Sequence, residues 1–503
     1  MISSEPQTFF GRSRLFRIGT LAGLLVLGLA VRLINLTNPP LDDGYRYLNS
    51  AIIARGMYYQ MLPNVDPTLR QKAIEMWKAA EAFEPPVFER IVAISYLFTG
   101  GEKLWLPRLY SILFWMLGGI GLYWLSCRIF NVDGALTALA FYVVLPIGVI
   151  VSRRFQPDPF MVMWIIFAAL ALDYWRERGT WKSGLLAGVI CGIAVLIKVF
   201  AVFPVAVMAT MIVLSSGRGW QSLGNPKVWV TAAVMISIPG IYYLVDAGSR
   251  SAGYFLFWNV SFAHLLLKPW FYIRWSELLQ NVIGLLVVFI AMAGVTILKP
   301  GKQPLIIGWW VGYFLFGLAF PWQIHTHDYY SLMLVPLVAM SLAPVAVLFF
   351  EHLTQQARIW QIGFLGVALL ALASPTWSVR AKLLDSDQRV NWRAWEKIGK
   401  ALPQDGTMIA LTPDYGVREK YFAWLNVELW PHGYDYAMAE TRSGGQKPNF
   451  DEEFADRTQG MTYFLIIDES ELELQPQLKE KLYSNYPIHD QGDGYTLFRL
   501  LPK

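Results

Sequence analysis

Apolar runs about as long as a bilayer crossing recur through the first three quarters of this sequence, and shorter charged segments separate them. Of the 503 residues, 55% are hydrophobic and only 16% are charged, which is too apolar for a soluble chain of this length. The runs lack the alternation of apolar and polar residues that a transmembrane β-barrel requires. The sequence therefore predicts an all-α polytopic membrane protein.

We expect eleven spans, each bounded by charged or turn-forming residues. They lie at 18–36, 105–130, 135–151, 160–174, 184–197, 199–215, 228–245, 278–298, 305–320, 330–350 and 359–374. Lys198 separates two of them, because the 32 residues from 184 to 215 are too long for one crossing. The first run is longer than the apolar core of a cleaved signal peptide, so we expect it to be retained.

The distribution of Lys and Arg predicts a cytoplasmic amino terminus. The segments placed inside by this orientation carry Arg12, Arg14, Arg17, Arg128, Arg176, Arg178, Lys182, Arg218, Lys227, Lys299, Lys302 and Arg358. The loop 37–104, the turn 153–158, Lys198, the loop 246–277, the turn 325–328 and the chain after Trp377 then face outward. The unusual polar clusters therefore fall together on the outer side of the cytoplasmic membrane.

Two regions are expected outside the spans. In the first outer loop, 37–104, the segments 48–61 and 68–83 have helical spacing and mixed character, which predicts interfacial helices. After residue 376 the composition changes: 408–411 and 463–467 are typical of short buried strands, and 475–483 of a helix. We therefore expect a transmembrane domain over 1–376 and a small soluble α/β domain over 377–503.

Cysteine and charge exclude several other classes of protein. Cys127 and Cys191 lie in or beside apolar runs, so neither a disulfide framework nor metal-ligand spacing is present. The net charge of +5 is spread over loops, without the basic, aromatic-rich surface of a nucleic-acid-binding protein.

Asp42 and Asp43 directly follow the first span. Carboxylates at a membrane boundary are costly to desolvate unless they are solvated, paired or used. One carboxylate can take a proton from an attacking hydroxyl while its neighbour positions it. The alternative is the solvated start of a loop.

Cations at the outer ends of later spans suit an anionic group. Arg153 and Arg154 are adjacent in a tight turn, and a guanidinium group offers a planar fork of donors to a phosphate. Lys198, between two spans, could serve as a second counter-charge. The alternatives are anchoring of the arginines to lipid headgroups and snorkelling of the lysine.

Three further outer segments carry candidate side chains. Glu84 precedes the rigid pair Pro85 and Pro86, and the loop 246–277 contains His264. The turn from His325 to Tyr330 includes His327, Asp328 and Tyr329. A metal site built from this turn alone is not expected, because alternate residues point in different directions in most backbones.

In this order, the motifs resemble the GT-C superfamily of membrane glycosyltransferases, specifically the group of protein O-mannosyltransferases and aminoarabinose transferases of lipid A. Leu41-Asp42-Asp43-Gly44-Tyr45-Arg46 fills the place of the family's acidic pair after the first span, with Asp in place of Glu. The resemblance implies that Asp42 is the catalytic base and Asp43 its partner, with Tyr45 and Arg46 beside them.

Other elements of that family resemble later parts of this chain between about 18 and 350. Phe83-Glu84-Pro85-Pro86 and Leu106-Pro107-Arg108-Leu109 are similar to two of them, but a lysine that holds the donor phosphate in some relatives is missing. Arg153, Arg154 and Lys198 are the expected substitutes. The turn with Asp158 and the segment from His327 to Tyr330 match further elements, and in the aminoarabinose branch the counterpart of Glu84 and a loop histidine, here His264, bind a metal.

The resemblance implies an inverting glycosyltransferase that moves a sugar from a polyprenyl-phosphate donor to a lipid, glycan or protein acceptor on the outer membrane face. A divalent metal ion is a possible cofactor. The alternative from another class is a transporter or flippase of lipid-linked sugars. A transporter would place its polar residues near the bilayer midplane, whereas these lie at span ends on one side.

The predicted topology can be tested by thiol labelling. Cysteines introduced at Asp66 and Asp405 should react with a membrane-impermeant reagent applied to intact cells, and one at Gly179 should not, because the positive-inside rule places only the first two outside. Protection of position 405 until lysis would put the carboxy-terminal domain in the cytoplasm.

Overall fold

A computed structural model describes residues 8–41, 44–80, 84–217, 219–246, 253–254, 256–385, 387–389, 391–404, 406–443 and 449–500. The chain forms two compact units. The first, here called the helical unit, comprises Met1–Leu36, Phe83–Pro85 and Pro107–Asp385. The second, called the sheet unit, comprises Thr37–Ala82, Pro86–Leu106 and Ser386–Lys503.

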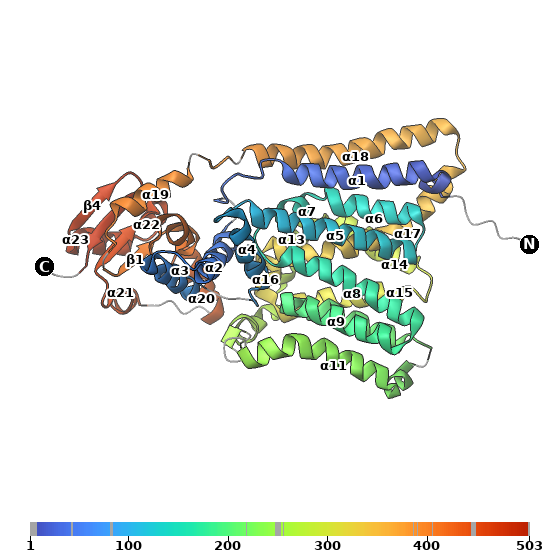
Figure 1. The fold of residues 1–503 in the computed structure, drawn as a ribbon, viewed down its shortest axis with the longest axis horizontal. Coiled ribbons are helices and arrows are strands. Elements are labelled where there is room, and N and C mark those ends of the chain that lie inside the picture. The colour runs from blue at the N-terminus through green and yellow to red at the C-terminus, as the bar shows by residue number, and fades with distance from the viewer. Residues whose placement is uncertain are drawn as a thin grey trace, which may run out of the picture. The chain divides into compact units, whose positions relative to one another are not determined.

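The helical unit consists of helices packed side by side (Figure 1). They are α1 (Arg14–Leu33), α5 (Leu106–Ile129), α6 (Val132–Val144), α7 (Pro146–Val151), α8 (Asp158–Arg178), α9 (Trp181–Ile197), α10 (Val202–Leu214), α11 (Pro226–Gly240), α13 (Pro269–Val282), α14 (Leu285–Thr296), α15 (Gln303–Ala319), α16 (Pro321–Thr326), α17 (Leu334–Thr354) and α18 (Arg358–Asp385). Every expected span contains a helix, which confirms the helical class of this region.

Among the described residues, five helices are long and apolar enough to cross a membrane, and a bent pair could add a sixth. Five further apolar helices are shorter, so a count of eleven crossings stays a prediction. The expected span 278–298 is wrong as a single helix, because α13 and α14 meet at an angle of 90°. The bend lies at Gly284, whose φ of +97° is open to glycine and strained for other residues.

Glycines allow the close approach of neighbouring helices in this unit. Gly184, Gly188 and Gly192 recur every fourth residue on α9, and a Cβ on any of them would lie within 3.0 Å of an atom of α11. Gly312 of α15 similarly meets the backbone of α10, where a Cβ would lie 2.4 Å from Cα of Pro204. Small residues that bring backbones together are a general means of packing helices in a membrane.

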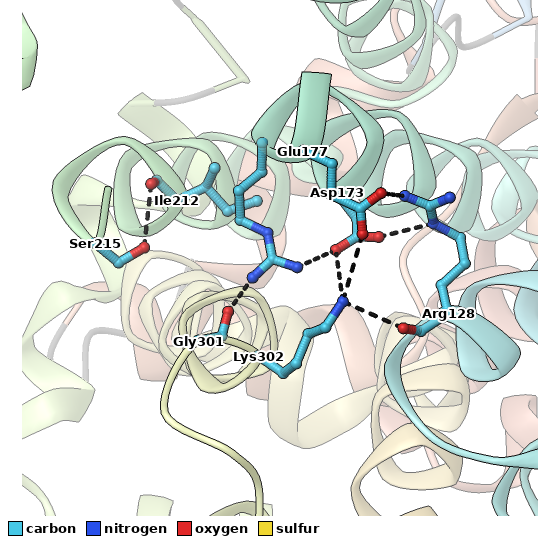
Figure 2. A network of polar contacts seen from close by, with 8 residues as sticks. Arg128, Asp173, Glu177, Ile212, Ser215, Gly301 and Lys302 are labelled. Carbon is cyan, nitrogen blue, oxygen red and sulfur yellow. Dashed lines mark hydrogen bonds and ion pairs between the residues drawn. The ribbon is translucent and has the colours of Figure 1, made fainter. Parts of the chain in front are cut away.

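An ion-pair network joins the carboxyl end of α8 to its neighbours (Figure 2). Asp173 is buried, and its carboxylate lies 2.8 Å from Nε of Arg128, 2.5 Å from Nη2 of Arg176 and 3.9 Å from Nζ of Lys302. Glu177 also pairs with Arg128, at 2.7 Å. Three cations that the positive-inside rule placed on one side of the membrane therefore converge on a single buried carboxylate.

The sheet unit contains a five-stranded mixed sheet with the order β2-β1-β3-β5-β4. Its strands are β1 (Met408–Leu411), β2 (Glu428–Leu429), β3 (Tyr463–Ile466), β4 (Ile488–Gly492) and β5 (Tyr495–Arg499). β1 pairs in parallel with β2 and β3, whereas β5 is antiparallel to β3 and β4. The expected strands β1 and β3 are confirmed, as is the small carboxy-terminal sheet.

Helices cover both faces of this sheet. They are α19 (Trp392–Ala401), α21 (Phe450–Thr458), α22 (Glu469–Glu473) and α23 (Pro476–Asn485). A further helix, α20 (Gly433–Ser443), contributes no buried residue. Ala410 and Leu465 contribute to a cluster with Ile398 of α19. Phe464, which precedes Leu465 on β3, contributes to a second cluster with Leu478 of α23. Alternate strand residues thus supply two separate cores, as the pleat of a strand requires.

The first expected outer loop belongs to the same compact unit as the carboxy-terminal domain. It forms α2 (Tyr45–Met61), α3 (Pro67–Ala79) and α4 (Val87–Thr99). Arg55 of α2 lies 3.8 Å from the ring centre of Tyr421 and 4.2 Å from that of Trp424, and its Nε is 2.9 Å from Glu102. All residues of α2 from Tyr47 to Tyr58 are buried, so α2 is a core helix of this unit. The boundary expected at 376/377 falls inside α18.

The network in Figure 2 makes a prediction about stability. Asp173→Asn should lower the free energy of unfolding by about 1.5–3 kcal/mol, because the buried charge that accepts hydrogen bonds from Arg128 and Arg176 is lost. Glu177→Gln is the matched control, since Glu177 is 46% exposed, and should cost less than about 1 kcal/mol. Denaturant titration of the purified variants in detergent measures both; equal losses would mean that the buried position of Asp173 does not matter.

Candidate active site

Most of the predicted polar residues of the helical unit gather where α8 begins. α7 ends at Val151, the turn 152–157 follows, and Asp158 is the first residue of α8. α9 packs against α8 and returns along it, so Lys198 at its carboxyl end comes back to the start of α8. Pro159 at the second position of α8 has no backbone N–H to leave unsatisfied there.

Lys198 is the centre of this cluster. Its Nζ donates to Oδ1 and Oδ2 of Asp158 at 2.9 and 3.0 Å and lies 3.4 Å from Oε1 of Glu84. The side chains of Lys198 and Asp158 are both 0% exposed, and that of Glu84 is 13% exposed. A buried ammonium group is tolerated only when it is paired in this way. The ammonium group of Lys198 is therefore shared by two carboxylates, which give this group of three a formal charge of −1.

Aromatic rings complete the surroundings of Lys198. Its Nζ lies 5.0 Å from the ring centre of Tyr330 and 5.5 Å from those of Tyr329 and Phe200. Tyr329 and Tyr330 belong to a helical turn, η6 (Asp328–Met333), that leads into α17. The predicted segment 327–330 is thus brought to Lys198, with the ring of His327 5.3 Å from that of Tyr329.

The turn between α7 and α8 carries the two arginines. Arg153 is buried and donates from Nη2 to the carbonyl of Asn35 at 3.1 Å. Nη1 of Arg154 lies 3.6 Å from Oδ1 of Asp328, which is an ion pair but too long for a hydrogen bond. Ser111 of α5 donates to the carbonyl of Arg154 at 2.7 Å and so holds the turn against α5.

Nε of Arg154 and Nε2 of Gln156 are buried on this turn and have no acceptor among the residues that the structure describes. Buried polar groups are nearly always hydrogen-bonded, and each one left unsatisfied costs free energy. An anion at the turn would supply acceptors to both donors, and this is the chemistry that the sequence predicted for Arg154.

Other predicted residues lie elsewhere. Asp42 and Asp43 fall outside the described residues. Tyr45 and Arg46 are in the first turn of α2 in the sheet unit, and the hydroxyl of Tyr45 lies 3.3 Å from Oδ1 of Asn49. His264 is in η5 (Val260–Leu267), with Nδ1 3.1 Å from the carbonyl of Ser261.

This arrangement gives little support to the predicted metal site at Glu84 and His264. Within the described part of the chain, no group of three or more His, Cys, Asp and Glu side chains is placed to hold a metal ion. Glu84 is close to Lys198, which competes with a metal for its carboxylate. A metal held by these two residues stays a prediction.

Sequence reasoning missed Arg32, which is fully buried near the end of α1. Its Nε donates to Oγ of Ser152 at 2.8 Å, and its Nη1 donates to the carbonyls of Gly28 and Val143, each at 2.8 Å. Arg32 thereby fixes the start of the turn that carries Arg153 and Arg154. An arginine inside an apolar span is itself a signal that could have identified it.

Comparison with known proteins finds a family model that is similar to this part of the chain. A family model described as dolichyl-phosphate-mannose-protein mannosyltransferase matches residues 83–243, which contain Glu84, Arg153, Arg154, Asp158 and Lys198. A comparison of the sequence with curated proteins finds no match.

Solved structures with the same fold include ArnT from Cupriavidus metallidurans in the apo state, with a TM-score of 0.59, 13% identity and coverage of 96% of this chain and 98% of that chain. ArnT bound to undecaprenyl phosphate gives a TM-score of 0.55 at 12% identity, covering 97% and 98% of the two chains. The oligosaccharyltransferase AglB from Archaeoglobus fulgidus, in complex with an inhibitory peptide and a dolichol-phosphate, gives 0.55 at 14% identity, covering 90% and 70%. The resemblance to the GT-C glycosyltransferases is therefore confirmed by a family match and by a shared fold.

The unsatisfied N–H groups of Arg154 and Gln156 predict where the phosphate of a polyprenyl-phosphate sugar donor binds. Arg154→Ala should weaken the binding of a polyprenyl-phosphate by about 1.5–3 kcal/mol, because a charged hydrogen bond is lost. Arg153→Ala tests the neighbouring guanidinium group, of which one nitrogen, Nη2, donates to the carbonyl of Asn35. Titration of the lipid into protein in nanodiscs measures both affinities.

Arg274→Ala is the control for these variants, because Arg274 is 68% exposed and pairs only loosely with Glu277. Unchanged affinity in both single variants and in the double variant would place the phosphate site elsewhere, and Lys198→Met would then be the next variant to measure.

Proposed function

We propose that this protein is an inverting glycosyltransferase that moves a sugar from a polyprenyl-phosphate donor to an acceptor on the outer face of the cytoplasmic membrane. The match to the mannosyltransferase family and the fold shared with ArnT and AglB support the class of reaction. The apolar helices support a location within a membrane.

The observation that carries the proposal is the turn 152–157. It presents Arg154 and Gln156 with buried donors that lack an acceptor among the described residues, at the end of helices suited to a bilayer. A phosphodiester offers acceptor oxygens and negative charge to such donors. A long lipid chain on the same phosphate would extend along the apolar helices. One ligand would then accept hydrogen bonds from the turn 152–157 and contact the apolar surfaces of the helices.

The proposed reaction is a displacement at the anomeric carbon of the sugar. The acceptor oxygen bonds to the anomeric carbon on the face opposite the phosphate, the bond from this carbon to the phosphate oxygen breaks, and the electron pair leaves with the lipid phosphate. Asp42 takes the proton of the acceptor hydroxyl as general base, with Asp43 positioning it. The N–H groups of Arg154, already in place before the reaction, stabilise the charge that develops on the leaving phosphate.

Lys198 serves this site through its two carboxylates. Because its ammonium group holds Asp158 and Glu84 together, it fixes the start of α8 and the orientation of Glu84 at once. We assign Glu84 to contact with the donor headgroup. Asp328 pairs with Arg154 and Tyr329 lies beside Lys198, so we assign both to the surroundings of the phosphate. Tyr45 and Arg46, which directly follow the acidic pair, are assigned to the acceptor side of the reaction.

Removal of the proposed base tests the assignment. Asp42→Asn keeps the size of the side chain but loses the base, so turnover should fall by about 10² to 10⁴ while lipid binding is retained. Asp43→Asn should cost less if Asp43 only positions its neighbour. Transfer of labelled sugar from a purified polyprenyl-phosphate donor, measured in nanodiscs over a panel of lipid, glycan and peptide acceptors, gives the rates.

If Asp42→Asn transferred sugar to a verified acceptor at the wild-type rate, Asp42 would not be the general base. If Asp43→Asn were the inactive variant instead, the two carboxylates would exchange roles.

A further inference from the structure

We infer that a groove in the helical unit binds an anionic phospholipid of the bilayer, with the lipid phosphate at the end of α8 that carries Asp173. The groove lies between α5, α8 and α9, its lining residues all belong to this one compact unit, and its volume is about 600 Å³. It ends short of the turn 152–157, where the donor phosphate is proposed to bind. The inference therefore concerns a second lipid and does not depend on the proposed function.

The walls of the groove are apolar over most of their length. Those on α8 are formed by Trp164, Phe167, Leu170, Ala171 and Tyr174. The spacing of three and four residues places these side chains along one face of the helix. α9 contributes Leu186 and Ile190, one turn apart, and α5 contributes Trp124. Trp124 and Leu186 are 56% and 48% exposed, so the groove is open along its side and a lipid chain can enter it from the bilayer.

The length of the groove is that of one leaflet. It begins at Tyr174, one turn from the end of α8, and follows the helix to Trp164, which is about 15 Å at a rise of 1.5 Å per residue. Half of a hydrocarbon core of about 30 Å has the same thickness. An acyl chain whose headgroup lies beyond Tyr174 therefore fills the groove without reaching the start of α8.

Each of the three helices brings a cation to the same end of the groove. On α8, Arg178 follows Tyr174 by one turn, and its guanidinium group lies 5.5 Å from the ring centre of Tyr174. On α9, Lys182 precedes Leu186 by four residues, which places both on one face of the helix. On α5, Arg128 itself lines the groove. The apolar walls thus lead to a positively charged end.

Two of these cations have no counter-charge from the described chain. Arg128 shares the carboxylates of Asp173 and Glu177 with the other cations of the network in Figure 2. Arg178 and Lys182, by contrast, form no ion pair within the part of the chain that the structure describes. Their charge is therefore open to an anion from the surroundings of the protein.

The charged end and the apolar walls together select the ligand. Cations at a helix end could simply extend into the headgroup region, and an apolar groove alone would accept any acyl chain. A groove with a positively charged end is complementary to a lipid that combines an acyl chain with a net negative headgroup. The phosphate oxygens accept hydrogen bonds from Arg178 and Lys182, and the chain covers the apolar walls.

Lipid retention tests the charge requirement. Full-length protein is released from nanodiscs that contain equal amounts of phosphatidylglycerol and phosphatidylcholine with the same acyl chains, and native mass spectrometry counts the lipids retained. The wild type should prefer phosphatidylglycerol by about fivefold or more, because only this lipid has a net negative charge. Arg178→Gln combined with Lys182→Gln should lower the preference to about twofold or less.

The control removes an equal charge outside the groove. Lys299→Gln combined with Arg358→Gln changes two exposed cations that the sequence predicts on the same side of the membrane, and neither of them lines the groove. This double variant should keep the preference of the wild type. Equal retention of the two lipids by the wild type, or equal losses in the two double variants, would overturn the inference, because the groove would then add nothing to the general charge of this side.

Filling the groove tests its role in binding the acyl chain. Leu186 is 48% exposed, so Leu186→Trp can place its larger ring in the groove without entering the core. The variant should retain clearly less phosphatidylglycerol and should bind polyprenyl phosphate with unchanged affinity. Weaker binding of polyprenyl phosphate with normal retention of phosphatidylglycerol would mean that the groove holds the chain of the donor, and the inference would be wrong. Arg178 and Lys182 are exposed, so their variants decide the question even if Leu186→Trp fails to fold.

Discussion

The buried ion pair between Lys198 and Asp158 is the interaction on which the arrangement of the candidate site depends. It joins the end of α9 to the start of α8, and both side chains are 0% exposed, so solvent screens the charges little. Glu84, the turn with Arg154 and the rings of Tyr329 and Tyr330 are all placed by contact with these two residues or with their neighbours. Replacement of either partner alone would leave a buried charge and would disturb every one of them.

α8 carries a second buried carboxylate, Asp173, near its other end. A helix of 21 residues is about 30 Å long, close to the thickness of the hydrocarbon core. Both ends of α8 are thus joined to neighbouring helices by ion pairs. Elsewhere in the helical unit, glycines on α9 and α15 allow the close approach of α11 and α10. This division suits a membrane, where charges are tolerated at the boundaries and close packing replaces the hydrophobic effect in between.

Much of the local structure could be predicted from the sequence, because it depends on nearby residues. The strands at 408–411 and 463–466 follow from their short apolar runs, and the end of α9 follows from Lys198. The bend at Gly284 could not be predicted, since the apolar pattern continues through it. The union of α2 with the carboxy-terminal domain rests on contacts such as that of Arg55 with Tyr421, which are 366 positions apart. Local patterns carry no information about such pairs.

For the candidate site, the residue types and their order were predictable but their partners were not. Lys198 was expected to face a phosphate, whereas its ammonium group lies between Asp158 and Glu84. The role predicted for Arg154 stays a prediction, and a buried N–H group that no described residue satisfies supports it. The difference arises because a buried lysine requires carboxylates from several helices, and only the fold determines which ones are near.

The central claim is that the bond between sugar and lipid phosphate is broken, and one measurement tests it most directly. Wild-type protein in sealed vesicles is given a polyprenyl-phosphate donor labelled in both its sugar and its lipid, with membrane lipids and peptides as acceptors. The account predicts that free polyprenyl phosphate and glycosylated acceptor appear in equal amounts on the outer side. Passage of the intact donor across the membrane, with no free polyprenyl phosphate formed, would contradict it and would identify a transporter instead.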